Sequence, residues 1–430
     1  MTRQMSPDAR YVLAVLARSP IRVPEIDVRL VHDLVDGPPE HTEQVLDELL
    51  AAGELRPAWT AGVWALTGTP SADDALAEGR TARRGHDPTE VLLAWLVGVA
   101  VEADHTVSPL SWRLAKPAGP TSWPFGGRRG AVAWWELHRA ELLTFLQDLL
   151  DRRLWRLTWT LAEALWGLGR ATGYAQVQIT SQRIGLLAIV NDHENAVDPD
   201  AERARAYLLR RAVFSTRLAF GLSDAGEHVL AVRAADQGVE TAKQAGDPIA
   251  LAAALSTRAR TVLAARAVDR VEDGIRDARQ ALVLDDAHEY LRGAGLRHRR
   301  LGELYALAGR VPDALMEFSV AVDLLDRAGD AVGRAVVQAI TGHVLVGAGR
   351  ATDALTPLRT ALTTFADVGT AGQLGHAYHG LGLAALALGG RETARLYLTS
   401  AEQHYENGNL GDRADDVRHL LDTTLAEDVS

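Results

Sequence analysis

Residues 301–330 read LGELYALAGRVPDALMEFSVAVDLLDRAGD, and the chain repeats this pattern twice more, from residue 341 and from residue 381. Three glycines mark the same interval, namely Gly309, Gly349 and Gly389. Self-similarity at a fixed period of roughly 20–50 residues is typical of stacked supersecondary units that bury their apolar faces against their neighbours. The stretch from residue 301 to residue 409 therefore predicts a repeat array and not a single central core.

Other positions keep the same interval and are either consistently small or consistently bulky. The small registers are Gly302/Gly342/Gly382, Ala314/Ala354/Ala394 and Ala321/Ala361/Ala401, and the bulky ones are Phe318/Leu358/Leu398 and Leu325/Phe365/Tyr405. Two antiparallel helices approach closely only where a side chain is small, and we expect the large residues to fill the gaps between successive pairs. The glycines at 309, 349 and 389 suit the turns between helices, where a positive φ costs glycine nothing.

These residues resemble the tetratricopeptide pattern of leucine–glycine, tyrosine, alanine, phenylalanine and alanine. The first copy has Leu301-Gly302, Tyr305, Ala314, Phe318 and Ala321, the second Gly342, Leu345, Ala354, Leu358 and Ala361, and the third Leu381-Gly382, Ala394, Leu398 and Ala401. The usual unit has about 34 residues, so either the helices or the turns between repeats are longer here. The resemblance is specific over residues 289–409 and looser back to residue 201. It implies an all-α solenoid of helix pairs.

In tetratricopeptide arrays the first helix of each pair lines a concave groove that receives peptides. Counted from the repeat pattern, the residues that the resemblance places in this groove are Arg299, Glu303, His343, His376 and His379. An ordinary solvated polar face is the alternative for these particular side chains. Because the concavities of solenoids are extended binding surfaces, we predict a peptide or protein partner.

His376 and His379 are three residues apart and share a helix face, which raises the question of a metal site. A pair at this spacing is a weak signal, and no carboxylate or third histidine is clearly placed beside it. We predict no metal and no other cofactor. The chain also has no Walker motif, no nucleotide-binding glycine motif in a strand–turn–helix context and no nucleophile elbow. We therefore predict that it is not an enzyme.

Composition limits the remaining function classes. The 430 residues carry a formal net charge of −11 and no cysteine, which excludes disulfides, a thiol nucleophile and cysteine-bound metal. The acidic balance disfavours extensive nucleic-acid contact, although it permits a local basic patch. The apolar run Val91–Val101 is too short to span a bilayer, and the N-terminal segment 1–20 lacks a signal-peptide pattern. We expect a cytoplasmic protein with no membrane partner, and homo-oligomerisation stays open.

Residues 1–68 predict a module that resembles a winged helix. Ser6-Pro7 begins one helix, Pro24 a second that carries Ile26, and Glu40–Ala52 form a third, followed by a short wing within 56–66. Residues 1–66 hold six Arg and no Lys against ten Asp and Glu, a net of −4. The third helix offers Thr42 and Gln44 as its only candidate base-reading side chains, so we prefer a protein-contact or spacer role to DNA binding.

Residues 69–130 predict a connector with one helix from about Asp87 to Asp104 and a Pro/Gly-rich arm that lies on a surface. The segment GGRRG (126–130) lacks the phosphate-binding motif and its preceding strand, so turn chemistry explains it better. From residue 131 to about residue 425 the apolar spacing is helical, with pairs at 201–222/226–245 and 249–265/271–284 before the clean repeats.

A second resemblance covers more of the chain. The segments AVAWWELHRAELL (131–143), WTLAEALW (159–166) and QRIGL (182–186) look like helices of actinobacterial signal-transduction ATPase regulators, which include the large antibiotic-regulatory proteins. In that family an NTPase module precedes a degenerate winged helix, a connector and a tetratricopeptide array. The present chain is similar to the C-terminal part, without the NTPase module, so the resemblance does not imply ATP switching. We expect a regulatory or scaffold protein, with a peptide-sensing, DNA-binding transcriptional regulator as the alternative.

Overall fold

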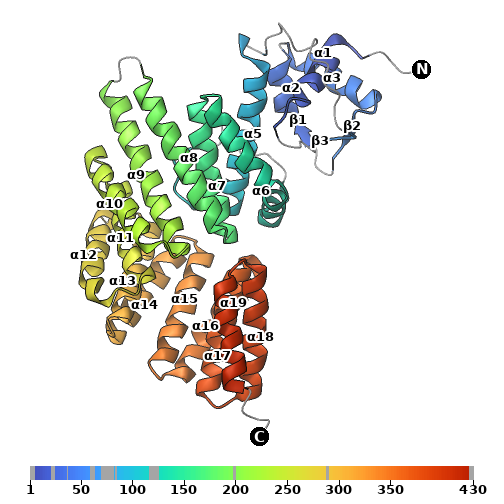
Figure 1. The fold of residues 1–430 in the computed structure, drawn as a ribbon. Helices are drawn as coiled ribbons and strands as arrows, with labels where there is room; N and C mark the ends of the chain where they lie inside the picture. The colour runs from blue at the N-terminus through green and yellow to red at the C-terminus, as the bar shows by residue number, and fades with distance from the viewer. Residues whose placement is uncertain are drawn as a thin grey trace. The chain divides into compact units, whose positions relative to one another are not determined.

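The computed structural model describes residues 5–20, 25–35, 37–58, 63–68, 82, 85–115, 125–196, 200–286 and 290–425. The chain forms two compact units, residues 1–168 and residues 169–430. Figure 1 shows that the second unit consists of helices stacked side by side. No helix of the described ranges is long and apolar enough to cross a membrane.

The first unit begins with three helices and three short strands. In chain order these are α1 (Pro7–Leu16), β1 (Glu25–Asp27), α2 (Val28–Leu34), α3 (Pro39–Ala51), β2 (Leu55–Pro57) and β3 (Val63–Leu66). Ser6 caps α1 as predicted, since its hydroxyl accepts a hydrogen bond from the amide of Ala9. The strands form one antiparallel sheet in the order β1-β3-β2.

The predicted start of the second helix is wrong. Ile26 lies in β1, opposite Trp64 of β3, and the helix begins at Val28. Asp27 ends the strand and caps the helix, because its carboxylate accepts from the amide of Leu30. Pro24, where the sequence pattern placed the start, lies outside the described residues.

The connector contains the expected helix, α5 (Pro88–Val107), and Asp87 caps it. The residues after α5 are held against the helix Trp155–Thr172, because the amides of Leu114 and Ala115 donate to the buried carboxylate of Glu163 at 3.0 and 2.7 Å. The rest of the predicted Pro/Gly-rich arm, residues 116–124, lies outside the described part. Gly126 and Gly127 have positive φ values of 62° and 86° and lead into α6 (Arg128–Asp151), so the GGRRG segment is a turn and a helix start.

The helices from residue 155 onward continue to the end of the described chain. They are α7 (Trp155–Thr172), α8 (Ala175–Glu194), α9 (Ala201–Asp224), α10 (His228–Ala245), α11 (Pro248–Ala264), α12 (Val271–Asp286), α13 (Leu291–Leu307), α14 (Val311–Arg327), α15 (Ala331–Gly347), α16 (Ala351–Val368), α17 (Ala371–Ala387), α18 (Arg391–Asn407) and α19 (Gly411–Leu425). The second unit begins at Gly169, within α7.

The long repeat period now has a structural explanation. The first helices of the clean repeats begin at Leu291, Ala331 and Ala371, and each has 17 residues. Short turns join the helices, so the extra length relative to the usual tetratricopeptide unit mostly lengthens the helices. Gly309, Gly349 and Gly389 have φ values of 74°, 74° and 79°, as their place in the turns predicted.

The small registers mark the closest approaches between helices. A Cβ atom built on Gly302 would lie 2.5 Å from Phe318, one on Gly342 would lie 2.3 Å from Leu358, and the same relation holds between Gly382 and Leu398 at 2.6 Å. The bulky residue therefore fills the space opposite the glycine of its own pair. Phe318 also belongs to an apolar cluster that includes Ile275 of α12 and Val337 of α15, so it bridges successive pairs as expected.

Candidate functional site: the inner face of the helical array

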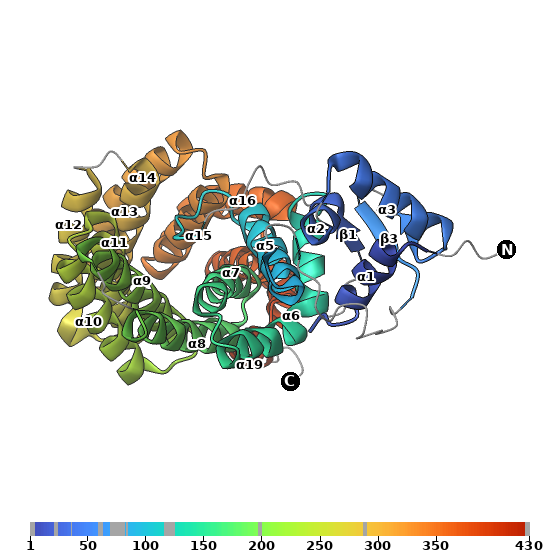
Figure 2. The same ribbon diagram turned by 90° about the horizontal axis from the view of Figure 1, so that it is seen from above.

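The first helices of the pairs lie on the inner side of the curved array. Each of α9, α11, α13 and α15 contacts the next first helix along the chain, whereas the second helices make no comparable contacts with one another in the described part. In Figure 2, α10, α12 and α14 accordingly lie outside α11 and α13. Side chains that point from the first helices away from the second helices therefore share one concave face.

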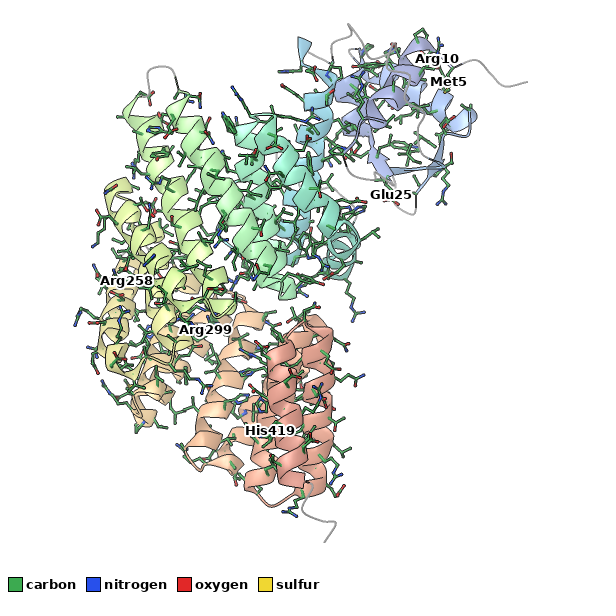
Figure 3. The ribbon with its side chains drawn as sticks, viewed as in Figure 1. Met5, Arg10, Glu25, Arg258, Arg299 and His419 are labelled. Carbon is green, nitrogen blue, oxygen red and sulfur yellow. The ribbon has the colours of Figure 1, made fainter. Side chains whose placement is uncertain are left out.

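Arg299 and Glu303 are one helical turn apart on α13, and both side chains are half-buried. Arg299 is labelled in Figure 3. Arg299 Nε lies 3.9 Å from Glu303 Oε1, too far for a hydrogen bond, and this buried Nε has no hydrogen-bond partner among the described residues. Glu303 instead accepts a hydrogen bond from Nη1 of the neighbouring Arg300. The two predicted groove residues are thus together, and two arginines share one carboxylate.

The same helix carries further arginines. Arg297 and Arg300 are buried, at 8% and 7% of full exposure, and Arg297 Nε lies 3.2 Å from Oδ2 of the fully buried Asp285. Arg292 donates from Nε to Asp330 at 2.8 Å. Because a guanidinium keeps its charge in proteins, each of these side chains needs a carboxylate or water nearby.

Two arginines from earlier helices join this group. Arg260 of α11 donates to Asp224 of α9, and its guanidinium lies 4.0 Å from the centre of the Phe220 ring. Arg170, near the end of α7, lies over the same ring at 5.2 Å. We call Arg170, Arg260, Arg292, Arg297, Arg299 and Arg300 the arginine cluster.

Electrostatic interactions show that the cluster is one unit. The surrounding protein atoms, which displace solvent, and repulsion from Arg292, Arg299 and Arg260 lower the pKa of Arg170 to about 10. Part of the side chain is nevertheless exposed at the surface. Burial is also the main cause that lowers the pKa of Arg300 to about 9, with Glu303 opposing it and the neighbouring arginines adding to it. Arg170 and Arg300 both remain protonated near neutral pH, so positive charges lie close together, and little water screens the charge of the buried Arg300.

The three predicted histidines form a separate group between α15 and α17. The rings of His343 and His376 stack with centroids 4.1 Å apart, and His379 meets His343 edge-on at 5.5 Å. His343 Nε2 donates a hydrogen bond to the carbonyl oxygen of His376 at 2.9 Å. Burial lowers the pKa of all three, to about 4 for His379, and Arg413 adds to the shift. They are therefore neutral near pH 7 and pack as aromatic rings.

This arrangement does not resemble a metal site. Stacked rings direct their nitrogens past one another, whereas a metal needs them to converge on one point. In the ranges that the structure describes, no group of three or more histidines and carboxylates could hold a metal ion.

Sequence reasoning identified Arg299 but missed the other members of the arginine cluster. A local signal did exist, because RHRR at 297–300 is a dense basic run in an acidic chain. Arg170 and Arg260 had no such signal, since only the curvature of the array brings them to α13.

No protein-family model and no curated protein sequence matches the chain. Among solved structures it is similar to aspartyl phosphate phosphatase F of Bacillus subtilis, at 12% identity and a TM-score of 0.50, over 95% of this chain and 97% of that one. The structural relatives are tetratricopeptide-repeat proteins. This chain folds as a tetratricopeptide-like helical solenoid.

Two further similarities have lower scores. A signal-transduction ATPase with a tetratricopeptide sensor, from Pyrococcus horikoshii, matches at 11% identity and a TM-score of 0.48, over 99% of this chain and 65% of that one. A Rap protein in complex with competence and sporulation factor matches at 12% identity and 0.41, over 69% and 98%. At such identities the similarity concerns the fold.

Proposed function

We propose that this chain is a non-catalytic regulatory or scaffold protein whose tetratricopeptide-like array binds a peptide or protein on its inner face. The observation that carries the proposal is the concentration of half-buried charged side chains on consecutive first helices, centred on Arg299. Placing charges close together in a poorly solvated region costs free energy, and a purely structural solenoid has no need of it. A bound partner that supplies hydrogen-bond acceptors recovers that cost.

Peptide display on the full-length chain, followed by hydrogen exchange, tests this proposal. Peptides selected for binding should slow amide exchange in α9, α11 and α13 and leave the second helices α10, α12 and α14 unchanged. Selected peptides that protect only the second helices, or only residues 1–168, would contradict it.

Side-chain substitutions give an independent test. Arg299→Ala and Glu303→Ala should weaken binding of the selected peptides about tenfold each, because each removes a charged hydrogen-bonding group from the inner face. Arg276→Ala is the matched control, since Arg276 is an exposed arginine on the second helix α12. All three variants should keep the helicity of the parent chain.

For the N-terminal module we propose a winged helix that contacts another protein or acts as a spacer. Supporting this are the element order helix–strand–helix–helix–strand–strand and the antiparallel sheet order β1-β3-β2. On α3, Glu43 and Asp47 are exposed, and Thr42 is buried at 1% exposure with its hydroxyl 3.1 Å from the ring of His32. The expectation that Thr42 is available to read bases is therefore wrong. Of the two candidate base-reading side chains, Gln44 remains.

DNA binding through this module is the second candidate, and it rests on the same topology. A mobility-shift assay with the full-length chain and mixed-sequence duplexes separates the two. We expect no shift at 150 mM salt, because α3 presents carboxylates where a phosphate backbone would lie. Tight, salt-dependent binding would favour the DNA-binding regulator. The division into residues 1–68, 69–130 and 131–425, as in ATPase-linked regulators, is part of this proposal.

A further inference from the structure

We propose that the arginine cluster is a binding site for carboxylates of the partner, and that the partner is an acidic peptide segment. This inference rests on the proposed function and specifies the chemistry of its ligand. The arginine cluster makes an unoccupied inner face energetically unfavourable, and its chemistry determines which kind of ligand would bind there.

The local charge is unbalanced. The five arginines Arg260, Arg292, Arg297, Arg299 and Arg300 are paired with four carboxylates, those of Asp224, Asp285, Glu303 and Asp330. Glu303 serves both Arg299 and Arg300, and Asp224 attracts Arg170 as well as Arg260. An incoming anion is therefore attracted by several guanidinium groups at once.

Hydrogen-bonding capacity is also unused. Within the described part of the chain, the buried Nε atoms of Arg299 and Arg300 have no hydrogen-bond partner. A guanidinium and a carboxylate match in a planar, two-bond geometry, and such charge-assisted bonds are among the strongest in proteins. A carboxylate of the ligand placed against Arg299 would accept a hydrogen bond from its Nε. Glu303 would then no longer be the shared counter-ion of both Arg299 and Arg300.

The extent of the cluster favours a peptide over a small anion. Its members come from α7, α11 and α13, and two of them, Arg170 and Arg260, lie over the same Phe220 ring of α9. The Arg170 and Arg260 guanidinium groups lie 5.2 and 4.0 Å from the centre of this ring, so groups from different helices are close neighbours. A single phosphate presents one anionic group, whereas an acidic peptide presents several carboxylates along a chain that advances roughly 3.3 Å per residue, so it can pair with more than one of these arginines at once.

The overall charge of the chain adds selectivity. With a formal net charge of −11, the remainder of the protein repels acidic segments, and the arginine cluster is where that repulsion is reversed. Such an arrangement favours binding of an acidic segment in one place and disfavours it elsewhere.

Fluorescein-labelled hexaglutamate is a direct probe, with hexaglutamine as the uncharged control. Anisotropy titration of the full-length chain at 50 mM salt should show hexaglutamate binding that weakens at 500 mM salt, and no hexaglutamine binding. Arg299→Gln should weaken binding at least about tenfold, and Arg276→Gln should leave it unchanged. Arg299 is chosen because its ion pair is long, so its loss threatens folding least, and an unchanged melting temperature confirms this.

Two results would overturn the proposal. One is hexaglutamate binding that Arg299→Gln and Arg276→Gln affect equally. The other is that hexaglutamate does not bind. If tripolyphosphate then binds and Arg299→Gln abolishes that binding, the cluster is a phosphate site instead. If display-selected peptides without acidic residues still protect α9, α11 and α13, the proposed function stands and only this inference fails.

Discussion

Gly342→Ala adds one methyl group at the tightest of the repeated helix contacts. Its Cβ would lie 2.3 Å from Cγ of Leu358, 2.7 Å from Cδ2 and 3.0 Å from Cδ1. Carbon atoms pack at about 3.5–4.0 Å, and Leu358 is fully buried, so the leucine has to move by an ångström or more. The same contact recurs in the other two clean repeats, which makes it a property of the array.

Two opposing effects set the magnitude. Overpacking a buried contact costs about 1–3 kcal/mol, and replacing a helical glycine by alanine gains about 1 kcal/mol of helix propensity. The first effect is the larger at so short a contact, and we expect Gly342→Ala to lower the free energy of unfolding by up to about 2 kcal/mol. Gly347→Ala is the matched control in the same helix, because no described atom lies within 4 Å of its Cβ position, and it should be neutral or slightly stabilising.

A double-mutant cycle isolates the contact. Leu358→Ala removes all three atoms that the new methyl would meet, so in that background Gly342→Ala should become neutral or stabilising, a coupling of about 2 kcal/mol. Urea denaturation followed by circular dichroism measures the free energies, and hydrogen exchange in α15 and α16 localises the effect, since repeat arrays can unfold in parts. Equal effects of Gly342→Ala in both backgrounds would refute the packing argument.

Three further outcomes test other parts of the structure. Ala354→Arg should cost about 3–5 kcal/mol in thermal or urea unfolding, since Ala354 is fully buried among leucines, and a near-neutral melting temperature would show that the helix register is wrong. Because burial lowers the pKa of His343 and of His379 (to about 4) in the folded state, the unfolded chain binds more protons between about pH 6.5 and pH 4. Stability should thus be fully present above pH 6.5. On acidification the free energy of unfolding should fall by at most about 1.4 kcal/mol per pH unit for each histidine. His379→Gln should flatten this slope in pH-dependent urea titrations, and an unchanged slope would contradict the burial of His379 in its neutral form. Asp87→Ala should cost about 1 kcal/mol in the first unit, because the carboxylate caps α5 through the amides of Thr89 and Glu90, and Asp87→Asn should retain most of the stability.

Some features of the fold follow from the local amino-acid sequence. Gly309 and its equivalents need a positive φ to reverse the chain, and only the residue type is required to predict that. The cap of α1 at Ser6 and that of α5 at Asp87 were predictable for the same reason, since a cap is a contact between near neighbours. The start of α2 was not predictable, because Ile26 belongs to a strand whose partner residue, Trp64, lies far away along the chain.

The candidate site likewise has features that the sequence predicts and features that it does not. The repeat pattern placed Arg299, Glu303 and the three histidines on first helices, because periodicity determines which positions share a helix face. It could not show that His343 and His376 stack as neutral rings, since that depends on how α15 packs against α17. Nor could it bring together Arg170 and Arg260, which belong to helices well separated in the sequence.

The sequence by itself determined that this protein is a stack of helix pairs with glycine turns and a concave face, because repetition at a constant period encodes each unit and its neighbour. Only the tertiary structure decided where the charge lies on that face. The curvature of the array brings Arg170, Arg260 and Arg299 from three helices close enough together to repel one another. The interactions of a charge depend on distance and solvent and not on position in the chain, so the arginine cluster exists only in the folded array.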